Sequence, residues 1–455
     1  MTKTNPFCDV CGKEFLRNGG LERHKANKTP CKPPRDHVKV AKPAGELAEK
    51  APAPDPDAEA LTLTVPEFRE NSKKFNESLT REQRSDQGIF FTPKKARDIL
   101  FAALEPLNLS PKKILEPSFG TGEFILDAKK KYPFAEIIGV EKNPELFKSF
   151  VSSSNDGTYH CCDFLDWKGE ADLIIGNPPY FVMEKTTKAP AAQAKAMTGR
   201  PNIYVMFLYK CLEEHMREGA HLAFIIPTSL YNCVYYQPMR DYIHKHTTIV
   251  HLENLVKPGF FETGQDTMLI VLEKKKRNDD YFYQAMNGKL YISPFYTELK
   301  NTTEGATTMD KLGLATKTGN VVWNQVKDKL SDTPGTLLIY SSNINNCELK
   351  IGNLNGKERK QYVKDLDKPV LSGPVILVER GYGNSFSFNF LLTTLKYFYA
   401  ENHINVIYAK DEKDVSNLER VSRSFLLTKT HDFVKWFVGS GSISAKDLET
   451  MFPIF

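Results

Sequence analysis

A short strand-like segment, 172–176, leads directly into Asn177, Pro178, Pro179 and Tyr180. Two consecutive prolines fix the backbone and remove two N–H donors, so the carbonyl groups at this turn are held rigidly. The side-chain oxygen of Asn177 adds an acceptor, and Tyr180 offers a face on which a planar ring can stack. Acceptors aimed at one amine draw its protons and raise the nucleophilic character of its nitrogen. The four residues therefore predict a site that activates an amino group on a planar substrate; the alternative is a Pro-rich turn at a strand end.

A glycine-containing turn follows another apolar segment, 113–116, and contains Glu116, Ser118, Gly120 and Gly122. Glycine has no Cβ and adopts positive φ readily, so both glycines allow the backbone to approach a ligand closely. A lone glycine turn is a weak signal, because a simple tight turn has the same composition. Its place between a strand and a helix is nevertheless where α/β proteins bind their ligands.

Two further acids follow the glycine turn at the spacing of successive strands. The segment 136–141 reads as a second strand and ends in Glu141, about where dinucleotide-binding folds carry the acid that grips ribose hydroxyls. Asp163 and the adjacent Phe164 precede the strand-like segment 172–176. An acid can accept a hydrogen bond from the amino group of an adenine, and an adjacent aromatic side chain can stack on the adenine ring.

The N-terminus contains a separate group of metal-binding residue types. Cys8 and Cys11 form a close pair, and His24 and Cys31 follow after gaps of twelve and six residues. Thiolate and imidazole ligands at this spacing are typical of tetrahedral zinc. Residues 1–42 carry ten Lys or Arg against four Asp or Glu, whereas the net charge of the chain is +5. This excess suits contact with a polyanion, although a solvated basic tail has the same composition.

Short apolar segments alternate with amphipathic ones between residues 65 and 280. We expect a helix over 203–217, with Val205, Leu208, Leu212 and His215 on one face. Strand–helix alternation predicts an α/β fold whose mostly parallel sheet is covered on both faces. The expected strands are 113–116, 136–141, 172–176, 222–227, 249–255 and 267–273.

Composition divides the chain into four parts. We expect a zinc finger over 1–36, a flexible linker over 37–64, a catalytic domain over 65–280 and an α+β domain over 281–455. Alanine and proline dominate the linker, which lacks the large apolar residues that a core requires. Within the catalytic domain, residues 183–200 are small, basic and unpatterned, which predicts a mobile surface loop.

The 455 residues contain no apolar run of 18, and the polar start lacks the apolar stretch of a secretory signal. We therefore expect a soluble, intracellular protein with no membrane contact, located in the cytoplasm of a microbe or of a virus-infected host cell. The remaining cysteines have no metal-like spacing and are interpreted as ordinary thiols in a reducing compartment.

These motifs together resemble the S-adenosylmethionine-dependent DNA adenine methyltransferases whose cofactor motifs precede the catalytic one. The resemblance covers residues 85–275 well and the C-terminal third more loosely, and it implies a Rossmann-like catalytic domain followed by a target-recognition domain. Phe91, Thr92 and Pro93 match an element that packs beside the cofactor in such enzymes. The N-terminal finger, with Cys rather than His as its fourth ligand, resembles fingers of large DNA virus proteins.

The resemblance implies a role for each matching residue. Glu116, Ser118 and the glycine turn would hold the methionine part of the cofactor, Glu141 its ribose, and Asp163 with Phe164 its adenine. Asn177 to Tyr180 would hold the target base. Phe261 matches an aromatic that sandwiches the flipped base against the tyrosine; Phe260 is its substitute, and core packing is the alternative for either.

The first residue of the catalytic motif favours adenine as the substrate. Related enzymes that act on the cytosine amino group usually have Ser where this chain has Asn177, and those that methylate cytosine carbon need a Cys after Pro. The only Pro-Cys pair, Pro30-Cys31, belongs to the finger. Other Asn-Pro-Pro-Tyr enzymes methylate RNA or glutamine side chains, so these substrates stay open, as does a non-catalytic DNA-binding protein.

The expected partner is double-stranded DNA, with a separate restriction endonuclease as a further candidate; the sequence does not give the oligomeric state. In the C-terminal third, Lys317 and Arg380 are candidates for contact with bases or phosphates, and structural roles fit them equally well.

Overall fold

The computed structural model describes most of the chain beyond residue 90. Contacts divide the chain into Met1–Leu63 and Thr64–Phe455, and every described residue lies in the second unit. The expected finger, 1–36, and linker, 37–64, thus lie outside the described residues. The expected boundary after residue 280 lies within the second unit and stays a prediction. The described residues are 72–73, 75, 77, 91–152, 154, 156–182, 193–198, 202–255, 266–352, 359–381, 388–437 and 442–455.

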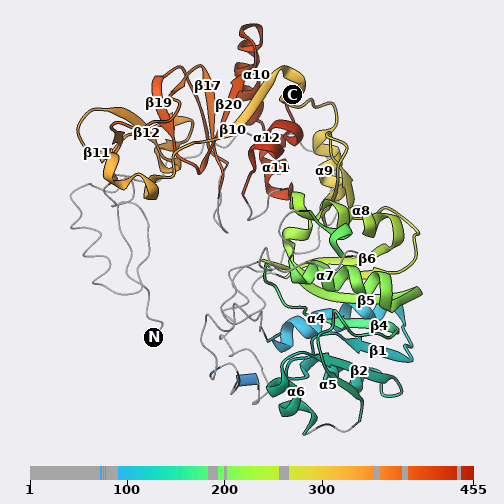
Figure 1. Cartoon of the computed structure of the whole chain (residues 1–455). Helices are drawn as coiled ribbons and strands as arrows, with labels where there is room; N and C mark the ends of the chain where they lie inside the picture. The colour runs from blue at the N-terminus through green and yellow to red at the C-terminus, as the bar shows by residue number, and fades with distance from the viewer. Residues whose placement is uncertain are drawn as a thin grey trace, which may run out of the picture. The chain divides into compact units, whose positions relative to one another are not determined.

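A seven-stranded sheet carries the expected motifs (Figure 1). Its strand order is β3-β2-β1-β4-β5-β7-β6, and every pair is parallel except those that β7 makes with β5 and β6. The mostly parallel sheet and the Rossmann-like α/β fold are therefore confirmed. The strands are β1 (Lys113–Glu116), β2 (Glu136–Glu141), β3 (Thr158–Cys161), β4 (Ala171–Gly176), β5 (Met216–Pro227), β6 (Thr248–Leu255) and β7 (Thr267–Glu273).

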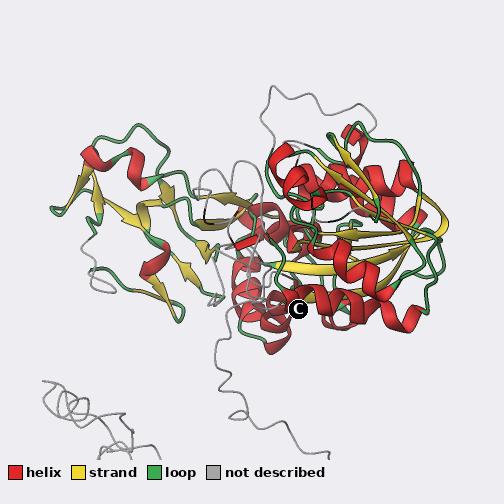
Figure 2. Ribbon diagram, turned by 90° about the horizontal axis from the view of Figure 1, so that it is seen from below, coloured by secondary structure: helices red, strands yellow, loops and turns green. Residues whose placement is uncertain are grey.

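Successive residues of each central strand enter two different cores. Leu115 and Ile174 belong to one buried cluster, whereas Ile114, Leu173 and Ile175 belong to another. Neighbouring side chains of a strand point to opposite faces, so both faces of the sheet are covered. Figure 2 shows helices on either side of the sheet. The helices of this part are α4 (Lys94–Leu104), α5 (Glu123–Lys131), α6 (Pro144–Val151), α7 (Ile203–Lys210) and α8 (Gln237–His246).

The helix expected over 203–217 is shorter than predicted. The α-helix ends at Lys210, a π-helical turn follows over Cys211–His215, and β5 begins at Met216. The imidazole Nδ1 of buried His215 lies 2.6 Å from the carbonyl oxygen of Gly169, which anchors the end of the helix. A contact between two residues distant in sequence thus ends the helix, although the apolar periodicity of the sequence continues. Strand β5 begins six residues before the expected segment 222–227.

Two other expectations need correction. The segment 158–161 forms strand β3, which pairs with β2 and was not expected. Within 183–200, Gln193–Ala196 forms a 3₁₀ helix, and Ala196 and Met197 are buried in a core cluster. Two adjacent apolar residues are too few to form a periodic pattern, but Ala196 and Met197 pack against the core and so do not belong to a surface loop.

The C-terminal part is built from smaller, mostly antiparallel sheets. One has the order β10-β20-β17-β18, with β10 (Leu314–Thr318), β20 (Ile404–Ala409), β17 (Val375–Glu379) and β18 (Phe390–Thr393). Its core includes apolar residues of α9, α10, α11 and α12. These helices are α9 (Tyr296–Thr303), α10 (Ser416–Phe425), α11 (Thr428–Phe437) and α12 (Ala445–Met451).

A second sheet of the C-terminal part has the order β11-β15-β12-β19-β16. Its strands are β11 (Leu330–Ser331), β15 (Tyr362–Val363), β12 (Thr336–Ile339), β19 (Lys396–Ala400) and β16 (Leu371–Ser372), and two hairpins, β8–β9 (Phe282–Gln284, Leu290–Ile292) and β13–β14 (Ile344–Asn345, Glu348–Leu349), complete this part.

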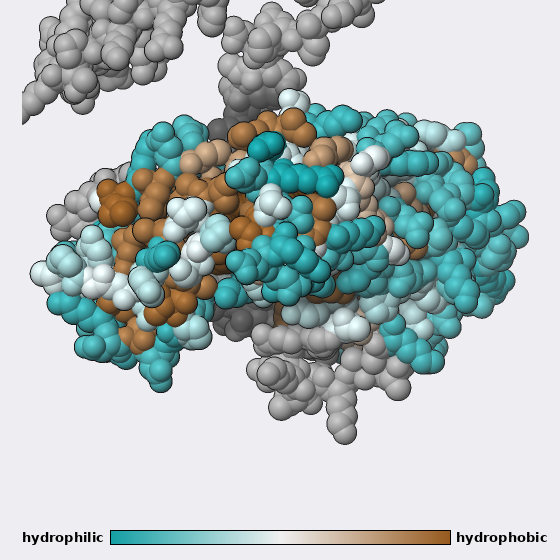
Figure 3. Space-filling model, turned by 90° about the horizontal axis from the view of Figure 1, so that it is seen from above, coloured by the Kyte–Doolittle hydropathy of each residue, from teal (hydrophilic) through white to brown (hydrophobic). Residues whose placement is uncertain are grey.

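The surface seen from above is uneven in hydropathy (Figure 3). Apolar residues, in brown, gather on one side of this face, and hydrophilic residues cover most of the rest. Exposed large apolar side chains of the C-terminal part include Ile351, Val370 and Tyr397. In the described ranges, no helix has the length and apolar character needed to cross a membrane.

Candidate active site

The glycine turn connects the end of β1 to the start of α5. Both Gly120 and Gly122 have positive φ, +56° and +77°. A Cβ on Gly122 would lie 2.0 Å from the ring of Phe150, whereas a Cβ on Gly120 would meet nothing closer than 4.0 Å. Gly122 is therefore required by packing as well as by backbone conformation, and Gly120 leaves open space beside the turn.

Two polar side chains with buried oxygen atoms border this turn. Glu116 is 3% exposed, and its Oε2 and the Oγ of Ser118 lack a hydrogen-bond partner among the described residues. Burial, and then the charge of Glu141, raise the pKa of Glu116 well above its ordinary value. Buried acceptors without partners destabilise a fold, so a ligand that donates hydrogen bonds here would recover that free energy.

Glu141 ties the turn to the end of β2. Its carboxylate accepts hydrogen bonds from the backbone N–H of Gly120, at 2.8 Å, and from that of Asn143, at 2.7 Å. Burial raises the pKa of Glu141. A carboxylate has about four lone-pair sites, so these two bonds leave capacity for ligand hydroxyls.

Asp163 and Phe164 have different environments. Asp163 accepts a bond from Lys142 Nζ at 2.7 Å and one from the backbone N–H of Leu165 at 3.0 Å. The ring of Phe164 is 2% exposed and packs against Phe207 and Trp167. The side chain of Asp163 is 29% exposed and so is accessible to a ligand just beyond β3, whereas Phe164 is a core residue.

Asn177 follows β4 directly and is held by two neighbours. Its Nδ2 donates to Thr92 Oγ1 at 3.0 Å, and its Oδ1 accepts from the hydroxyl of Tyr180. That hydroxyl also lies 2.7 Å from the carbonyl oxygen of Ile225, on β5. Pro178 is buried and Pro179 is half-buried. Burial raises the pKa of Tyr180 well above its ordinary value, so the hydroxyl stays protonated.

The two ends of the site are adjacent because β1 and β4 are paired. Leu115 is in register with Ile174, so the strands end side by side. A Cβ built on Gly176 would lie 3.6 Å from Cγ of Glu116. The structure thus brings the glycine turn and the Asn-Pro-Pro-Tyr turn to one edge of the sheet, as parallel strands require.

Thr92 and Arg97 extend the site beyond the sequence motifs. The side chain of Thr92 contacts Asn177, although the resemblance placed Thr92 beside the cofactor. Arg97, on α4, was not predicted as a site residue. It shares the buried face of α4 with Ala96, Leu100 and Leu104. A lone charge on an otherwise apolar helical face was the signal that could have identified it.

Other expected residues are placed as follows. Cys8, Cys11, His24, Cys31 and Phe261 lie outside the described residues. Within the described part of the chain, no group of three or more His, Cys, Asp or Glu is arranged to hold a metal ion.

The two candidate DNA contacts of the C-terminal part already have intramolecular partners. Lys317 Nζ lies 4.9 Å from the ring centroid of Tyr408, and Arg380 donates to the carbonyl oxygen of Asn402. Arg380 Nε is buried and has no partner among the described residues.

The chain matches known proteins over this site and beyond it. A family model described as Eco57I restriction-modification methylase matches residues 112–261. The type II methyltransferase M.CvrRI of Paramecium bursaria Chlorella virus XZ-6E is 33% identical over 401 residues, 85% of this chain and 99% of the relative. The modification methylase CviBIII of Paramecium bursaria Chlorella virus NC1A is 32% identical over 403 residues, 86% of this chain and 100% of the relative.

A solved structure, described as a class I S-adenosylmethionine-dependent methyltransferase from Listeria monocytogenes, is 18% identical, with a TM-score of 0.37 over 45% of this chain and 65% of that chain. The matches to the two viral relatives span almost their whole length at more than 30% identity. The chain therefore belongs to the type II methyltransferases of restriction-modification systems.

Proposed function

We propose that this chain transfers a methyl group from S-adenosylmethionine to the exocyclic amino group of adenine in duplex DNA. Its family membership makes it a site-specific DNA methyltransferase; the choice of adenine is the proposal. The observation that carries this choice is Asn177 itself, because related enzymes that act on the cytosine amino group usually have Ser at this position. Thr92 accepts from the amide nitrogen, so the amide oxygen faces the hydroxyl of Tyr180, whose place a target amine would take.

The residues around the glycine turn fit the cofactor. The unpaired acceptors of Glu116 and Ser118 suit the ammonium group of its methionine part, beside the open space at Gly120. Glu141 has lone pairs left for ribose hydroxyls, and Asp163 for an adenine amino group. When bound, S-adenosylmethionine supplies a methyl group made electrophilic by a positively charged sulfur.

Asn177 and Pro178 have the acceptors that a target amine requires. The oxygen of Asn177 and the carbonyl of Pro178 would accept hydrogen bonds from the two N–H groups of the amine and so leave its nitrogen lone pair free to react. With the cofactor bound, the adenine nitrogen would bond to the methyl carbon as the carbon–sulfur bond breaks, the sulfur would leave as a neutral thioether, and the methylated amine would release one proton to solvent, so no covalent bond to the enzyme is needed. The chain contributes positioning and electrostatics, the usual source of rate enhancement in such transfers.

Base capture requires adenine to leave the duplex, at a cost of roughly a few kcal/mol. Stacking on Tyr180, and on Phe261 from the other side, offsets this cost by about 1–3 kcal/mol per ring contact. The C-terminal part is proposed to recognise the target sequence, with Lys317 and Arg380 as candidate contacts.

We also propose that Cys8, Cys11, His24 and Cys31 bind structural zinc and that the basic N-terminus adds affinity for DNA phosphates. Metal analysis of purified full-length protein tests the first part: about one zinc per chain is expected, and loss of that zinc in a Cys8→Ser, Cys11→Ser variant. Zinc-free protein would contradict the assignment.

Modification-resolved sequencing of DNA from a host that expresses the chain tests the function. We expect N6-methyladenine at one position of one recurring sequence, and its absence from a host that expresses Asn177→Ala. Methylcytosine at a recurring sequence would contradict the proposed base. A restriction endonuclease that cleaves the same sequence when unmethylated would be the expected partner.

A further inference from the structure

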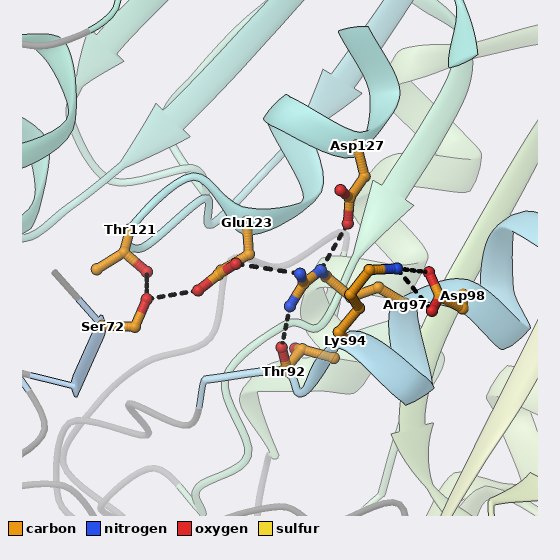
Figure 4. A network of polar contacts seen from close by, with 8 residues as sticks. All are labelled: Ser72, Thr92, Lys94, Arg97, Asp98, Thr121, Glu123 and Asp127. Carbon is orange, nitrogen blue, oxygen red and sulfur yellow. Dashed lines mark hydrogen bonds and ion pairs between the residues drawn. The ribbon is translucent and has the colours of Figure 1, made fainter. Parts of the chain in front are cut away.

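Arg97 is a buried charge that connects three separate segments (Figure 4). It lies on α4 and is 4% exposed. Its guanidinium donates to the carbonyl oxygen of Thr92 at 2.5 Å and to Asp127 Oδ2 at 2.7 Å, and it lies 3.2 Å from Glu123 Oε2. One positive charge is thus shared by two carboxylates and a backbone carbonyl, which is a geometry that only the planar arginine fork provides.

The carboxylate partners of Arg97 lie on α5, next to the glycine turn. We call this turn, with Glu116, Ser118 and Glu141, the cofactor end of the site. Glu123 is the first residue of α5 and follows Gly122 directly, and Asp127 lies one turn further along the helix. A second contact reinforces this end, since Ser72 Oγ bonds to Glu123 Oε1 at 2.5 Å and to Thr121 Oγ1 at 2.7 Å. Figure 4 shows Ser72, Thr121, Glu123 and Arg97 as a continuous polar network.

The carbonyl partner of Arg97 connects it to the Asn-Pro-Pro-Tyr turn, which we call the amine end of the site. It belongs to Thr92, whose hydroxyl oxygen accepts from the amide nitrogen of Asn177 at 3.0 Å. An Asn side chain can present either its oxygen or its nitrogen to a neighbour, because the two groups have nearly the same size. The bond to the Thr92 hydroxyl therefore helps to fix the Asn177 side chain with its amide oxygen on the side of Tyr180, where a target amine would bind.

We propose that Arg97 is a positioning residue for methyl transfer: it fixes Thr92 against the start of α5, and Thr92 in turn orients Asn177. This inference rests on the proposed role of Asn177. Arg97 itself does not touch the substrate. Arg97 affects the reaction through the hydroxyl of Thr92. This dependence on Thr92 distinguishes Arg97 from a salt-bridge residue that only stabilises the fold.

A double-mutant cycle on Arg97 and Thr92 tests this route. The rate of methyl transfer is measured in a single turnover at saturating S-adenosylmethionine and DNA for wild type, Arg97→Lys, Thr92→Val and the double variant. Misplacement of a reacting group by about 1 Å costs up to roughly 100-fold in rate, so each single substitution is expected to slow transfer by about 10- to 100-fold. The double variant is expected to be no slower than the slower single variant.

The opposite results would overturn the inference. If the two slowdowns multiply in the double variant, Arg97 acts independently of Thr92; if Arg97→Lys transfers methyl at the wild-type rate, it has no positioning role. Thr92→Ser, which keeps the hydroxyl, is expected to restore most of the rate lost in Thr92→Val. The dissociation constant for S-adenosylmethionine is expected to change only a few-fold in Arg97→Lys.

Two controls separate positioning from stability. Arg240 is also buried, at 0% exposed, and donates to backbone carbonyls, those of Leu290, Leu230 and Cys233. Arg240→Lys is expected to lower the melting temperature and leave the transfer rate unchanged. Asp98→Asn alters the exposed Lys94–Asp98 pair on α4 and is expected to change neither quantity.

Where Arg97→Lys yields no folded enzyme, Asp127→Asn replaces it in the cycle. Asp127→Asn weakens one ion pair of the Arg97 guanidinium but keeps the arginine. We therefore expect it to slow methyl transfer less than Arg97→Lys when Thr92 is present, and to cause no further slowdown in the Thr92→Val variant. The methylated base is identified in parallel. Methylcytosine from wild type would overturn the proposed function, while the presence or absence of coupling between Arg97 and Thr92 would still decide this inference.

Discussion

The cofactor end and the amine end of the site differ in how far their polar groups are satisfied. At the cofactor end, Glu116 Oε2 and Ser118 Oγ are buried without partners among the described residues. At the amine end, Asn177 is bonded to both Thr92 and Tyr180, and Tyr180 also contacts the carbonyl oxygen of Ile225. One end is prepared for a ligand, and the other is occupied by its own side chains.

The cofactor and the target base are therefore expected to bind in different ways. The cofactor gains hydrogen bonds that the free enzyme lacks, because it meets preformed acceptors. The target base must instead replace the Tyr180–Asn177 bond with its own amine, so its binding exchanges one hydrogen bond for another. We therefore expect the cofactor end to control affinity for S-adenosylmethionine and the amine end to control the rate.

Asn177→Ala is expected to have the largest effect and to separate the two ends. Removal of one preorganised polar group from a reacting centre costs about 10²–10³-fold in kcat. The dissociation constant for S-adenosylmethionine, measured by calorimetry, should stay within a few-fold of wild type. Transfer at the wild-type rate would remove Asn177 from the reaction, and a lost affinity for the cofactor would show that the two ends are not separate.

Gly122→Ala is expected to damage the cofactor end through the backbone. The left-handed conformation costs a residue with a Cβ roughly 1–2 kcal/mol, and overpacking against Phe150 adds roughly 1–3 kcal/mol. Gly120→Ala is the matched control, because its Cβ meets open space and only the conformational cost applies. Denaturant unfolding compares the two variants, and an equal loss of stability would show that contact with Phe150 is unimportant.

Tyr180→Ala and Tyr180→Phe are expected to differ at the amine end. Loss of the ring should weaken capture of the flipped base by about 1–3 kcal/mol, the value of one base–aromatic stack. Loss of the hydroxyl alone should cost little, since it frees Asn177 for the amine without removing the stack. DNA titrations of the transfer rate compare the variants. Equal losses for both would mean that the hydroxyl, and not the ring, binds the base.

The pH dependence of cofactor affinity is expected to be the smallest effect. The pKa of Glu116 is raised from 4.5 by burial, so its carboxyl stays protonated in the free enzyme up to that higher pKa. An ammonium group favours the carboxylate and releases the proton, so affinity should rise with pH by no more than about tenfold per unit in this window. Calorimetry across the window checks this, and Glu116→Gln should remove the dependence.

The same pKa shift predicts the sign of a stability change. A carboxyl group whose pKa is raised in the folded state contributes stability at pH values below its ordinary pKa of 4.5. This contribution is lost as the pH rises through the pKa of the folded state. At a pH above that value, Glu116→Gln should therefore raise the melting temperature of the free enzyme while it weakens cofactor binding. A lowered melting temperature there would mean that the Glu116 carboxylate has a partner in the free enzyme.

The strands that lead into the glycine turn and the Asn-Pro-Pro-Tyr turn were predicted well, because a local apolar segment indicates each of them. β1, β2 and β7 begin and end as expected, since each is a continuous apolar segment bounded by turn residues. The start of β5 was missed because the residues after Met216, Arg217 to Gly219, are exposed and have no apolar pattern. A contact between His215 and Gly169, distant in sequence, ends the preceding helix instead.

The network behind the site was not predictable for a similar reason. Arg97 meets Asp127, thirty residues away, and Thr92 meets Asn177, eighty-five residues away. Nothing in the spacing of these residues indicates that the sheet brings them together. In the C-terminal part, pairs such as β10 with β20 join segments equally distant in sequence, so its topology could not be predicted from local patterns.

The most direct test of the account is the identity of the methylated base. Purified wild-type enzyme is incubated with duplex DNA and S-adenosylmethionine that carries a deuterated methyl group, and the digested nucleosides are analysed by mass spectrometry. We expect label in N6-methyladenine, formed about 10²–10³-fold more slowly when Asn177→Ala replaces wild type. Label in N4-methylcytosine or 5-methylcytosine would contradict it.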